Sequence, residues 1–189
     1  MQDMDKKSEK QKMIDGDLYI AADPELTADR LRARILIRKF NDLDAALEDE
    51  RLGILKELLG SIGAGSMIEP PFRCDYGYNI HAGDNFYMNF GCVILDCAEV
   101  HIGNFLKCGP YVQIYTAHHP VNALERIAGP ELASPITIGD NVWLGGGSIV
   151  LPGVSIGDNT TIGAGSVVSK DIPSGVVAAG NPCRVIKTI

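Results

Sequence analysis

Hydrophobic residues recur at every sixth position in the C-terminal half of the chain. The aliphatic residues of this series are Ile138, Leu144, Val150, Ile156, Ile162 and Val168. A helix repeats near 3.6 residues and a single strand near 2, so neither produces a strict period of six. Six extended residues span about 20 Å, which suits one side of a prism. The pattern predicts a parallel β-helix with three hexads per coil, in which Ile138 stacks on Ile156. By the same spacing, Leu144 stacks on Ile162.

A weaker form of the period extends toward the N-terminus. Its inward positions are Ile62, Ile68, Cys74, Ile80, Phe86 and Cys92, and after a wider gap Ile102, Cys108 and Ile114. We expect one register shift, between Cys92 and Ile102. The period is absent from residues 119 to 135, and an unpatterned insertion of this length is usually functional or disordered. The sequence therefore predicts a loop of about 119–135 extruded from the β-helix, and a C-terminal cap formed by the tail.

The segment before the period predicts a polar tail followed by helices. Residues 1–12 are mostly charged or polar, as in a frayed terminus, and an irregular segment follows them. A first helix is expected to start at Thr27, which can cap it, with Leu31 and Ile35 on one face. The dipeptide 41–42 is a predicted break.

A second helix is expected from about residue 44 to residue 59, with Gly60 as its C-terminal stop. Two amphipathic helices this short are marginal alone, so they should pack on the β-helix or on a neighbouring subunit. We therefore divide the chain into 1–60, an N-terminal tail and helical region, and 61–189, a β-helix domain.

Composition narrows the classes of function. The 189 residues are 46% hydrophobic and carry a formal net charge of −7 at pH 7. This acidic balance argues against binding to nucleic acid or to an anionic membrane. No apolar run reaches the roughly 18 residues of a membrane-spanning helix, and the charged start lacks a signal-peptide apolar region.

The chain has five cysteines, and three of them, Cys74, Cys92 and Cys108, fall on inward positions. They are expected to be buried thiols rather than a disulfide framework. A reducing cytoplasm is the expected compartment.

The candidate chemistry centres on histidine. The chain contains His81, His101, His118 and His119, and the last two directly precede the unpatterned loop in the run YTAHHPV. Neutral imidazole near pH 7 can take a proton from a hydroxyl. These residues alone leave two interpretations open, a general base or a surface histidine beside a turn proline.

Longer motifs resemble a known family. The runs NFYMNF, YTAHHPV, ITIGDNVWLGGGSIVLPGVSIGDNTTIGAGSVVSKDIP and GNPCRVI, with MIDGDLYIAADPELTADRLRARILIRKFN at the front, are similar to the maltose and galactoside O-acetyltransferases. These are hexapeptide-repeat enzymes with a left-handed β-helix. The resemblance implies direct transfer of acetyl from acetyl-CoA to a sugar hydroxyl. It makes His119, directly before proline, the base and His118 a neighbour, with no acyl-enzyme and no metal.

The resemblance also implies acceptor-binding residues. Asn89 matches a position that contacts both substrates, and Tyr87 lies on the same face. Asp75, in RCDYGYN, matches an acceptor position where the maltose type has this run and galactoside enzymes have serine. Cys97 stands where the galactoside type has aspartate. These departures favour a maltose- or glucose-like acceptor.

Coenzyme-binding positions follow in the same way. Beyond Asn89, they are Trp143, Gly146, Ala164, Ser169, Lys170, Arg184 and Lys187. The small residues would lie along the pantetheine arm and the cations near the phosphates. Family members are homotrimers, which implies that His119 works beside coenzyme-binding residues of an adjacent chain.

Three alternatives remain. The first is a metal enzyme on the same fold, like the γ-type carbonic anhydrases, which hold zinc with histidines. The second is a non-catalytic scaffold, in which the β-helix only mediates assembly. The third is an acetyltransferase with a different acceptor, such as a galactoside, serine or a xenobiotic.

Overall fold

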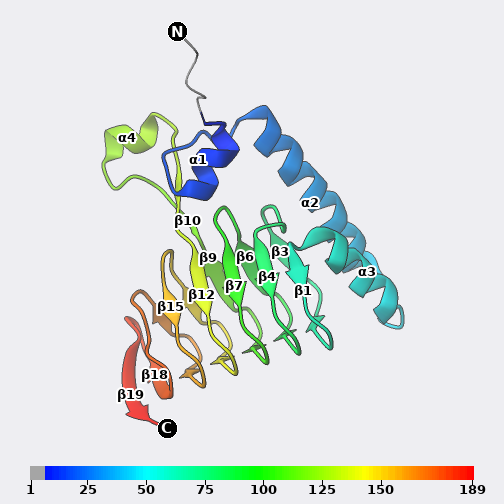
Figure 1. Cartoon of the computed structure of the whole chain (residues 1–189), viewed down its shortest axis with the longest axis vertical. Coiled ribbons are helices and arrows are strands. Elements are labelled where there is room, and N and C mark those ends of the chain that lie inside the picture. The colour runs from blue at the N-terminus through cyan, green and yellow to red at the C-terminus, as the bar shows by residue number, and fades with distance from the viewer. Residues whose placement is uncertain (1–6) are drawn as a thin grey trace.

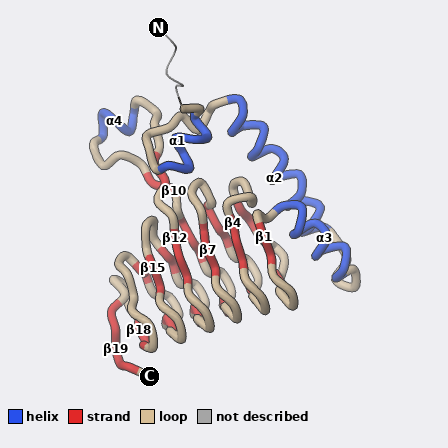
Figure 2. The backbone as a smooth tube through the Cα atoms, in the orientation of Figure 1, coloured by secondary structure: helices blue, strands red, loops and turns tan. Residues whose placement is uncertain are grey.

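The computed structural model describes residues 7–189, which form a three-sided β-helix with helices beside its first coil (Figure 1). The first side consists of β1 (Ser61–Ile62), β4 (Ile80–Ala82), β7 (Val100–Ile102), β12 (Ile136–Ile138) and β15 (Ser155–Ile156). The second consists of β2 (Met67–Ile68), β5 (Tyr87–Met88), β8 (Lys107–Cys108), β13 (Trp143–Leu144), β16 (Thr161–Ile162), β18 (Val176–Ala179) and β19 (Arg184–Thr188). The third consists of β3 (Arg73–Cys74), β6 (Val93–Leu95), β9 (Gln113–Tyr115), β14 (Ile149–Val150) and β17 (Val167–Val168). Short strands alternate with turns on every side (Figure 2).

The coils stack in parallel, as predicted. Ile138 pairs with Ile156, and Leu144 pairs with Ile162. On each side of the prism, two side chains that are two residues apart point inward. On the second side, for example, Val142 and Leu144 are at most 1% exposed. The predicted inward cysteines are also buried, and all five cysteines are free thiols.

The predicted register is wrong in one respect, because the N-terminal coils contain two shifts rather than one. The pairs that show this are Ile68–Met88, Met88–Cys108 and Leu144–Ile162, separated by 20, 20 and 18 residues. The extra residues lie in the corners 75–79 and 96–99. The second corner is the shift predicted between Cys92 and Ile102. The first was hidden because Phe86 and Cys92 occupy the second inward position of their sides.

Gly and Asn recur in the repeat because they occupy the corners between the sides of the prism. Asn141 and Asn159 have φ of 56° and 54°, a left-handed conformation that Asn tolerates better than most residues. At Gly139 the constraint is space, since a Cβ there would lie 2.1 Å from Oδ1 of Asp158 on the next coil. That oxygen accepts the N–H of Asp140 at 2.8 Å, so the later coil caps the corner of the earlier one.

The extruded loop is confirmed, but it has secondary structure of its own. Strands β10 (Ala117–His118) and β11 (Leu132–Ala133) pair antiparallel, and helix α4 (Ala123–Ile127) lies between them. We call β10, β11 and the residues between them the ribbon. It leaves the prism where the chain passes from the third side to the first. We call this the ribbon edge, formed by residues 75–79, 96–99 and 116–135.

The N-terminal region begins with a helix that the sequence did not predict. Helix α1 (Glu9–Asp15) begins within residues 1–12, the segment expected to be a frayed tail, and residues 1–6 of that tail lie outside the described residues. Ser8 caps α1 by accepting the N–H of Gln11 at 3.1 Å. Local capping therefore outweighs the polar composition.

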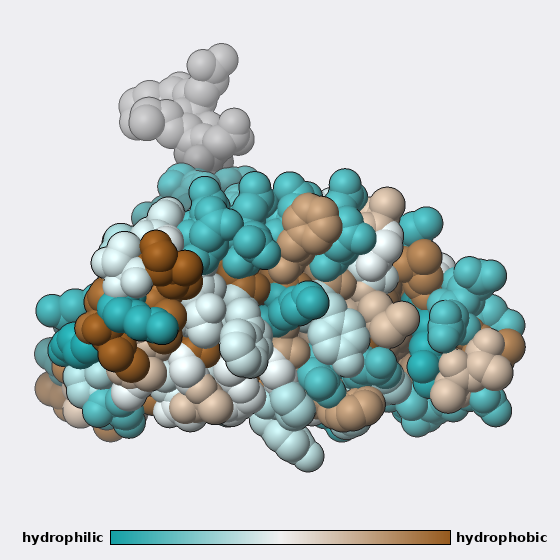
Figure 3. All heavy atoms as spheres, turned by 90° about the horizontal axis from the view of Figure 1, so that it is seen from below, coloured by the Kyte–Doolittle hydropathy of each residue, from teal (hydrophilic) through white to brown (hydrophobic). Residues whose placement is uncertain are grey.

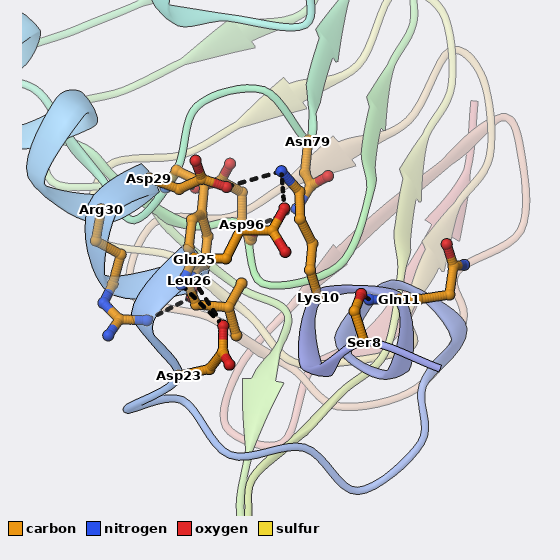
Figure 4. A network of polar contacts seen from close by, with 11 residues as sticks. Ser8, Lys10, Gln11, Asp23, Glu25, Leu26, Asp29, Arg30, Asn79 and Asp96 are labelled. Carbon is orange, nitrogen blue, oxygen red and sulfur yellow. Dashed lines mark hydrogen bonds and ion pairs between the residues drawn. The ribbon is translucent and has the colours of Figure 1, made fainter. Parts of the chain in front are cut away.

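Helix α2 (Pro24–Asp42) starts earlier than predicted. Its cap is Asp23, whose Oδ1 accepts the N–H groups of Glu25 and Leu26 (Figure 4), and Thr27 lies within the helix. The face carrying Leu31 and Ile35 is exposed, and the opposite face is buried. The buried residues are Leu26, Ala33, Leu36, Ile37 and Phe40.

Helix α3 (Glu48–Leu58) starts later than predicted, because Asp44 forms a turn with Leu47. Gly60 is not its stop, since the helix ends at Leu59 in an extended conformation. Helices α2 and α3 pack on the first coil in the same hydrophobic core as the prism. At the other end, β18 and β19 form an antiparallel pair at the edge of the second side. None of the helices among residues 7–189 is long and apolar enough to cross a membrane.

Candidate active site

His118 and His119 lie at the base of the ribbon but differ in environment. The ring of His118, in β10, is partly buried, and its Nε2 lies 3.1 Å from Oγ of Ser134. His119 is exposed, and its ring forms no hydrogen bond with any residue in the described range 7–189. Pro120, the next residue, is buried and fixes the chain at this point. His119 is therefore the one of the pair whose imidazole is free to exchange a proton.

Asp75 and Cys97 come together at the ribbon edge. The Sγ of Cys97 lies 3.5 Å from Oδ2 of Asp75, within donor distance for a thiol. Burial, and next the charge of Asp75, raise the pKa of the Cys97 thiol. The thiol is therefore held in its protonated form and acts as a donor.

The carboxyl of Asp75 is partly buried among polar side chains, and we call the group formed by Asp75, Cys97, Arg30 and Tyr76 the pocket. The pKa of Asp75 is raised, because burial outweighs the hydrogen bond from Cys97 and the charge of Arg30, which both lower it. The guanidinium of Arg30 donates to the hydroxyl of Tyr76 at 2.7 Å and to the carbonyl of Ala21 at 2.6 Å. The positive charge of Arg30 is thus held near enough to influence the Asp75 carboxyl, whose Oδ1 accepts no hydrogen bond within the described part of the chain.

Two residues that the sequence did not single out lie beside this group. Tyr19 and Glu131, 112 residues apart, form a backbone bridge, and the hydroxyl of Tyr19 donates to Oε2 of Glu131 at 3.0 Å. This contact ties the ribbon to the N-terminal region. No local pattern marks it, because it depends on where two irregular segments meet.

Tyr87 and Asn89 lie elsewhere, on β5 and directly after it. Oδ1 of Asn89 accepts the N–H of Phe90 at 2.7 Å, which leaves the amide nitrogen of Asn89 free to donate. Burial, and next the charge of Glu69, raise the pKa of Tyr87. Trp143 lies on the same outward row of the second side, two coils from Tyr87, and is 56% exposed.

The predicted coenzyme residues continue from there toward the C-terminal coils. We call the passage from the second side to the third the glycine edge, formed by residues 89–92, 109–112, 145–148 and 163–166. Gly146 and Ala164 lie on neighbouring coils of this edge, where Gly165 N–H donates to the carbonyl of Gly146 at 2.9 Å.

The cationic candidates are exposed at the C-terminal end of the prism. Ser169 and Lys170 directly follow β17, and Arg184 and Lys187 lie in β19. Small residues that admit a slender chain, followed by cations, suit pantetheine and phosphates, so the residues present fit coenzyme A.

One chain places these two sets at different edges. Asp75, Cys97 and His119 lie on the ribbon edge, whereas Asn89 and the small residues lie on the glycine edge. The third side separates the edges by about 15–20 Å, from its strand rise. The single chain thus does not unite all the predicted site residues.

His81 and His101 belong to neither set. Their rings stack on adjacent coils of the first side with centroids 5.2 Å apart. Residues 7–189 contain no group of three metal-binding side chains.

Comparison with known proteins identifies the family. Residues 12–63 match the maltose acetyltransferase hexapeptide capping motif, and residues 135–170 match the bacterial transferase hexapeptide repeats. Nodulation protein L of Rhizobium meliloti is 51% identical, over 95% of this chain and 98% of its own. A maltose O-acetyltransferase structure from Clostridium difficile 630 is 50% identical with a TM-score of 0.97, covering 98% of this chain and 99% of the other. The chain belongs to the maltose and galactoside O-acetyltransferase family.

A galactoside acetyltransferase in complex with coenzyme A superimposes with a TM-score of 0.92 at 40% identity, covering 97% of this chain and 92% of the other. Membership in this O-acetyltransferase family confirms the predicted fold class, a left-handed parallel β-helix with an N-terminal helical region and an extruded loop. It also confirms an acetyl-CoA-dependent O-acetyltransferase. The non-catalytic and carbonic-anhydrase-like alternatives therefore fall away.

Proposed function

We propose that the protein acetylates a hydroxyl of a glucose- or maltose-like sugar by direct transfer, with His119 as general base. The observation that carries this proposal is the position of His119. Its ring is exposed and forms no hydrogen bond within residues 7–189, and it lies on the same ribbon edge as Asp75 and Cys97. Ala117, Ala133 and Cys97 belong to one packed cluster, which holds the base of the ribbon against the pocket.

The reaction balances without a covalent enzyme intermediate. His119 accepts the proton of the sugar hydroxyl while the hydroxyl oxygen attacks the acetyl carbonyl carbon. The bond from that carbon to sulfur breaks, and the imidazolium returns the proton to the departing thiolate. Such a base contributes about 10²–10⁴-fold in rate. The free amide of Asn89 is suited to donate to the carbonyl oxygen as its charge grows.

The pocket chemistry supports a polyhydroxylated acceptor. A carboxylate with a free Oδ1 can accept sugar hydroxyls, and Cys97 keeps the Asp75 carboxyl in place through Oδ2. Burial raises the pKa of Asp75, and the hydrogen bond from Cys97 and the charge of Arg30 only partly oppose this shift. Glu131 adds a second carboxylate at the ribbon side of the pocket.

We further propose that the active form is a homotrimer with each site shared between adjacent chains. The separation of the ribbon edge from the glycine edge supports this, because His119 of one chain can approach Asn89 of the next. Apolar side chains on the ribbon are available for such a contact. These are Val121, Leu124 and Ile127, which are 95%, 79% and 79% exposed.

Other apolar side chains are exposed at the C-terminal end of the prism. At the left of Figure 3, where β19 lies in Figure 1, apolar residues gather among polar ones. Val185 and Ile186 of β19 are 47% and 65% exposed. The free cysteines support a reducing cytoplasm as the place where the protein works.

An acceptor panel at saturating acetyl-CoA tests the acceptor class. Release of coenzyme A is followed with glucose, maltose, a thiogalactoside, serine and chloramphenicol, and the acetylated product is confirmed by mass spectrometry. We expect the highest kcat/KM for glucose or maltose. A preference of tenfold or more for the galactoside, serine or the xenobiotic would show that the acceptor is misassigned.

Light scattering coupled to gel filtration tests the assembly. We expect a mass three times that of one chain, and a smaller species for a variant in which Leu124 and Ile127 are both changed to Asp. A monomeric wild-type protein with full activity would refute the shared site.

A further inference from the structure

Two polar residues are completely buried at the ribbon edge, and the proposed reaction does not use them. Asp96 and Thr116 both have 0% exposure. Asp96 directly follows β6, and Thr116 directly follows β9, so they lie on successive coils beside the pocket of Asp75. Buried polar groups of this kind are retained only where hydrogen bonds compensate the loss of water.

The carboxyl of Asp96 holds the corner that carries Asp75. Its Oδ1 accepts the N–H groups of Asp75 and Tyr76 at 3.0 and 2.9 Å, and its Oδ2 accepts that of Gly77 at 2.6 Å. Three successive N–H groups that converge on one carboxyl group form a backbone nest. Gly77 permits it, with a φ of 83° and no room for a Cβ, which would lie 2.5 Å from the carbonyl of Leu58.

The backbone of Asp96 is also held by a hydrogen bond, and the next residue contacts Asp75. Nδ2 of Asn79, which is 4% exposed, donates to the Asp96 carbonyl at 2.7 Å (Figure 4). Cys97, the next residue, contacts the Asp75 carboxylate. Residues 96–97 therefore contact Asp75 at two places: Asp96 at the backbone N–H and Cys97 at the carboxylate.

The hydroxyl of Thr116 forms hydrogen bonds to the residues on both sides of 96–97. Its Oγ1 donates to the carbonyl of Leu95 at 2.6 Å and accepts the N–H of Ala98 at 2.9 Å. The Thr116 carbonyl accepts the N–H of Ser134, whose Oγ contacts His118. One threonine thus links the Asp75 corner to the strands from which His119 projects.

We infer that Asp96 and Thr116 are positioning residues of the acceptor site, which fix Asp75 and Cys97 relative to His119. The inference rests on the proposed function for its kinetic meaning. Its structural content, the bracing of residues 95–98 by one hydroxyl, stands independently.

A set of three variants tests the role of Thr116. Thr116→Val removes the hydroxyl at nearly constant volume and leaves the Ala98 N–H without an acceptor, whereas Thr116→Ser keeps the hydroxyl. Ser166→Ala is the matched control. Ser166 is equally buried, and its Oγ donates to the Gly163 carbonyl and accepts the Gly180 N–H, but at the glycine edge.

We expect Thr116→Val to raise the acceptor KM about tenfold, the equivalent of about 1.4 kcal/mol, with the KM for acetyl-CoA unchanged within twofold. Thr116→Ser should restore the wild-type value. Ser166→Ala should leave the acceptor KM within twofold of wild type. A normal acceptor KM in Thr116→Val, or equal increases in both KM values, would overturn the inference.

Two further measurements keep the inference testable if Thr116→Val does not fold or if no sugar is acetylated. Asp96→Asn should raise the acceptor KM without changing that for acetyl-CoA. In either variant, alkylation of Cys97, mapped by mass spectrometry, should accelerate at least fivefold relative to Cys108, because the brace on its corner is lost. An unchanged ratio of the two alkylation rates rejects the brace even when the wild-type protein acetylates sugars, whereas an inactive wild type rejects only the proposed function.

Discussion

Replacing His119 with alanine should lower catalysis strongly and change stability little. The ring is exposed and makes no hydrogen bond within residues 7–189, so its removal should change the free energy of unfolding by less than about 0.5 kcal/mol. The loss of a general base should lower kcat by about 10²–10⁴-fold, which corresponds to about 2.7–5.4 kcal/mol in the barrier.

The adjacent His118 is the natural control, because its replacement should lower stability and change kcat little. His118→Ala removes a partly buried ring whose Nε2 lies 3.1 Å from Oγ of Ser134. The loss of this bond should cost about 1 kcal/mol of stability. For a chain of this length the melting temperature should fall by about 2–4 °C. The value of kcat should stay within tenfold of wild type.

Steady-state release of coenzyme A and thermal unfolding, measured on both variants at the same protein concentration, provide the comparison. Titration calorimetry with coenzyme A should show unchanged binding by His119→Ala. If this variant retains kcat within tenfold while His118→Ala loses it, the base is His118. If both retain it, the reaction does not use an imidazole at this edge.

Three further predictions address the shared site, a buried titration and the corners. Co-expression of His119→Ala with Ala164→Trp, each inactive alone, should recover about a quarter of wild-type activity if sites lie between chains, and none if each chain is self-sufficient. Burial raises the pKa of Asp96 to about 7, so the folded state binds an extra proton between about pH 4 and 7 and its stability falls as pH rises through that window. Asp96→Asn lacks this slope, so its stability relative to wild type, from urea unfolding, should increase from pH 5 to pH 8, and a constant difference contradicts the shift. Gly139→Ala should destabilise by about 1–3 kcal/mol because its Cβ has no room, whereas Gly53→Ala, an open helical site, should stabilise by about 0.5–1 kcal/mol; equal effects would refute the packing argument.

The repeat could be read from the sequence because its constraints are local to each hexad. An inward aliphatic residue and a tight corner are needed every six residues, and both leave a mark on residue type. The earlier coils were harder to align. Each side has two inward positions, so a two-residue slip moves a hydrophobic residue from one to the other. Phe86 remains buried after the slip at 75–79, and the pattern conceals it.

The start of α2 and the contact of the N-terminal region with the ribbon were harder to predict, because they depend on single side chains and on chain path rather than on a repeat. The start of α2 depends on one hydrogen-bonding side chain, Asp23, whose effect outweighs a plausible cap at Thr27. The contact of Tyr19 with Glu131 depends on the path of two irregular segments, and neither residue type nor spacing announces it.

The places where the period fails are where the candidate site residues of the ribbon edge lie. The two corners with extra residues carry Asp75 and Cys97, and the long interruption carries His119. All three lie on the ribbon edge, one coil above another. A regular hexad corner is too tight to hold a polar pocket, because its residues pack against the coil above, as Gly139 does. Extra residues release that constraint, and a buried carboxyl such as Asp96 can then organise the wider turn. In this protein, departures from the repeat are therefore a better guide to the proposed acceptor site than the repeat itself.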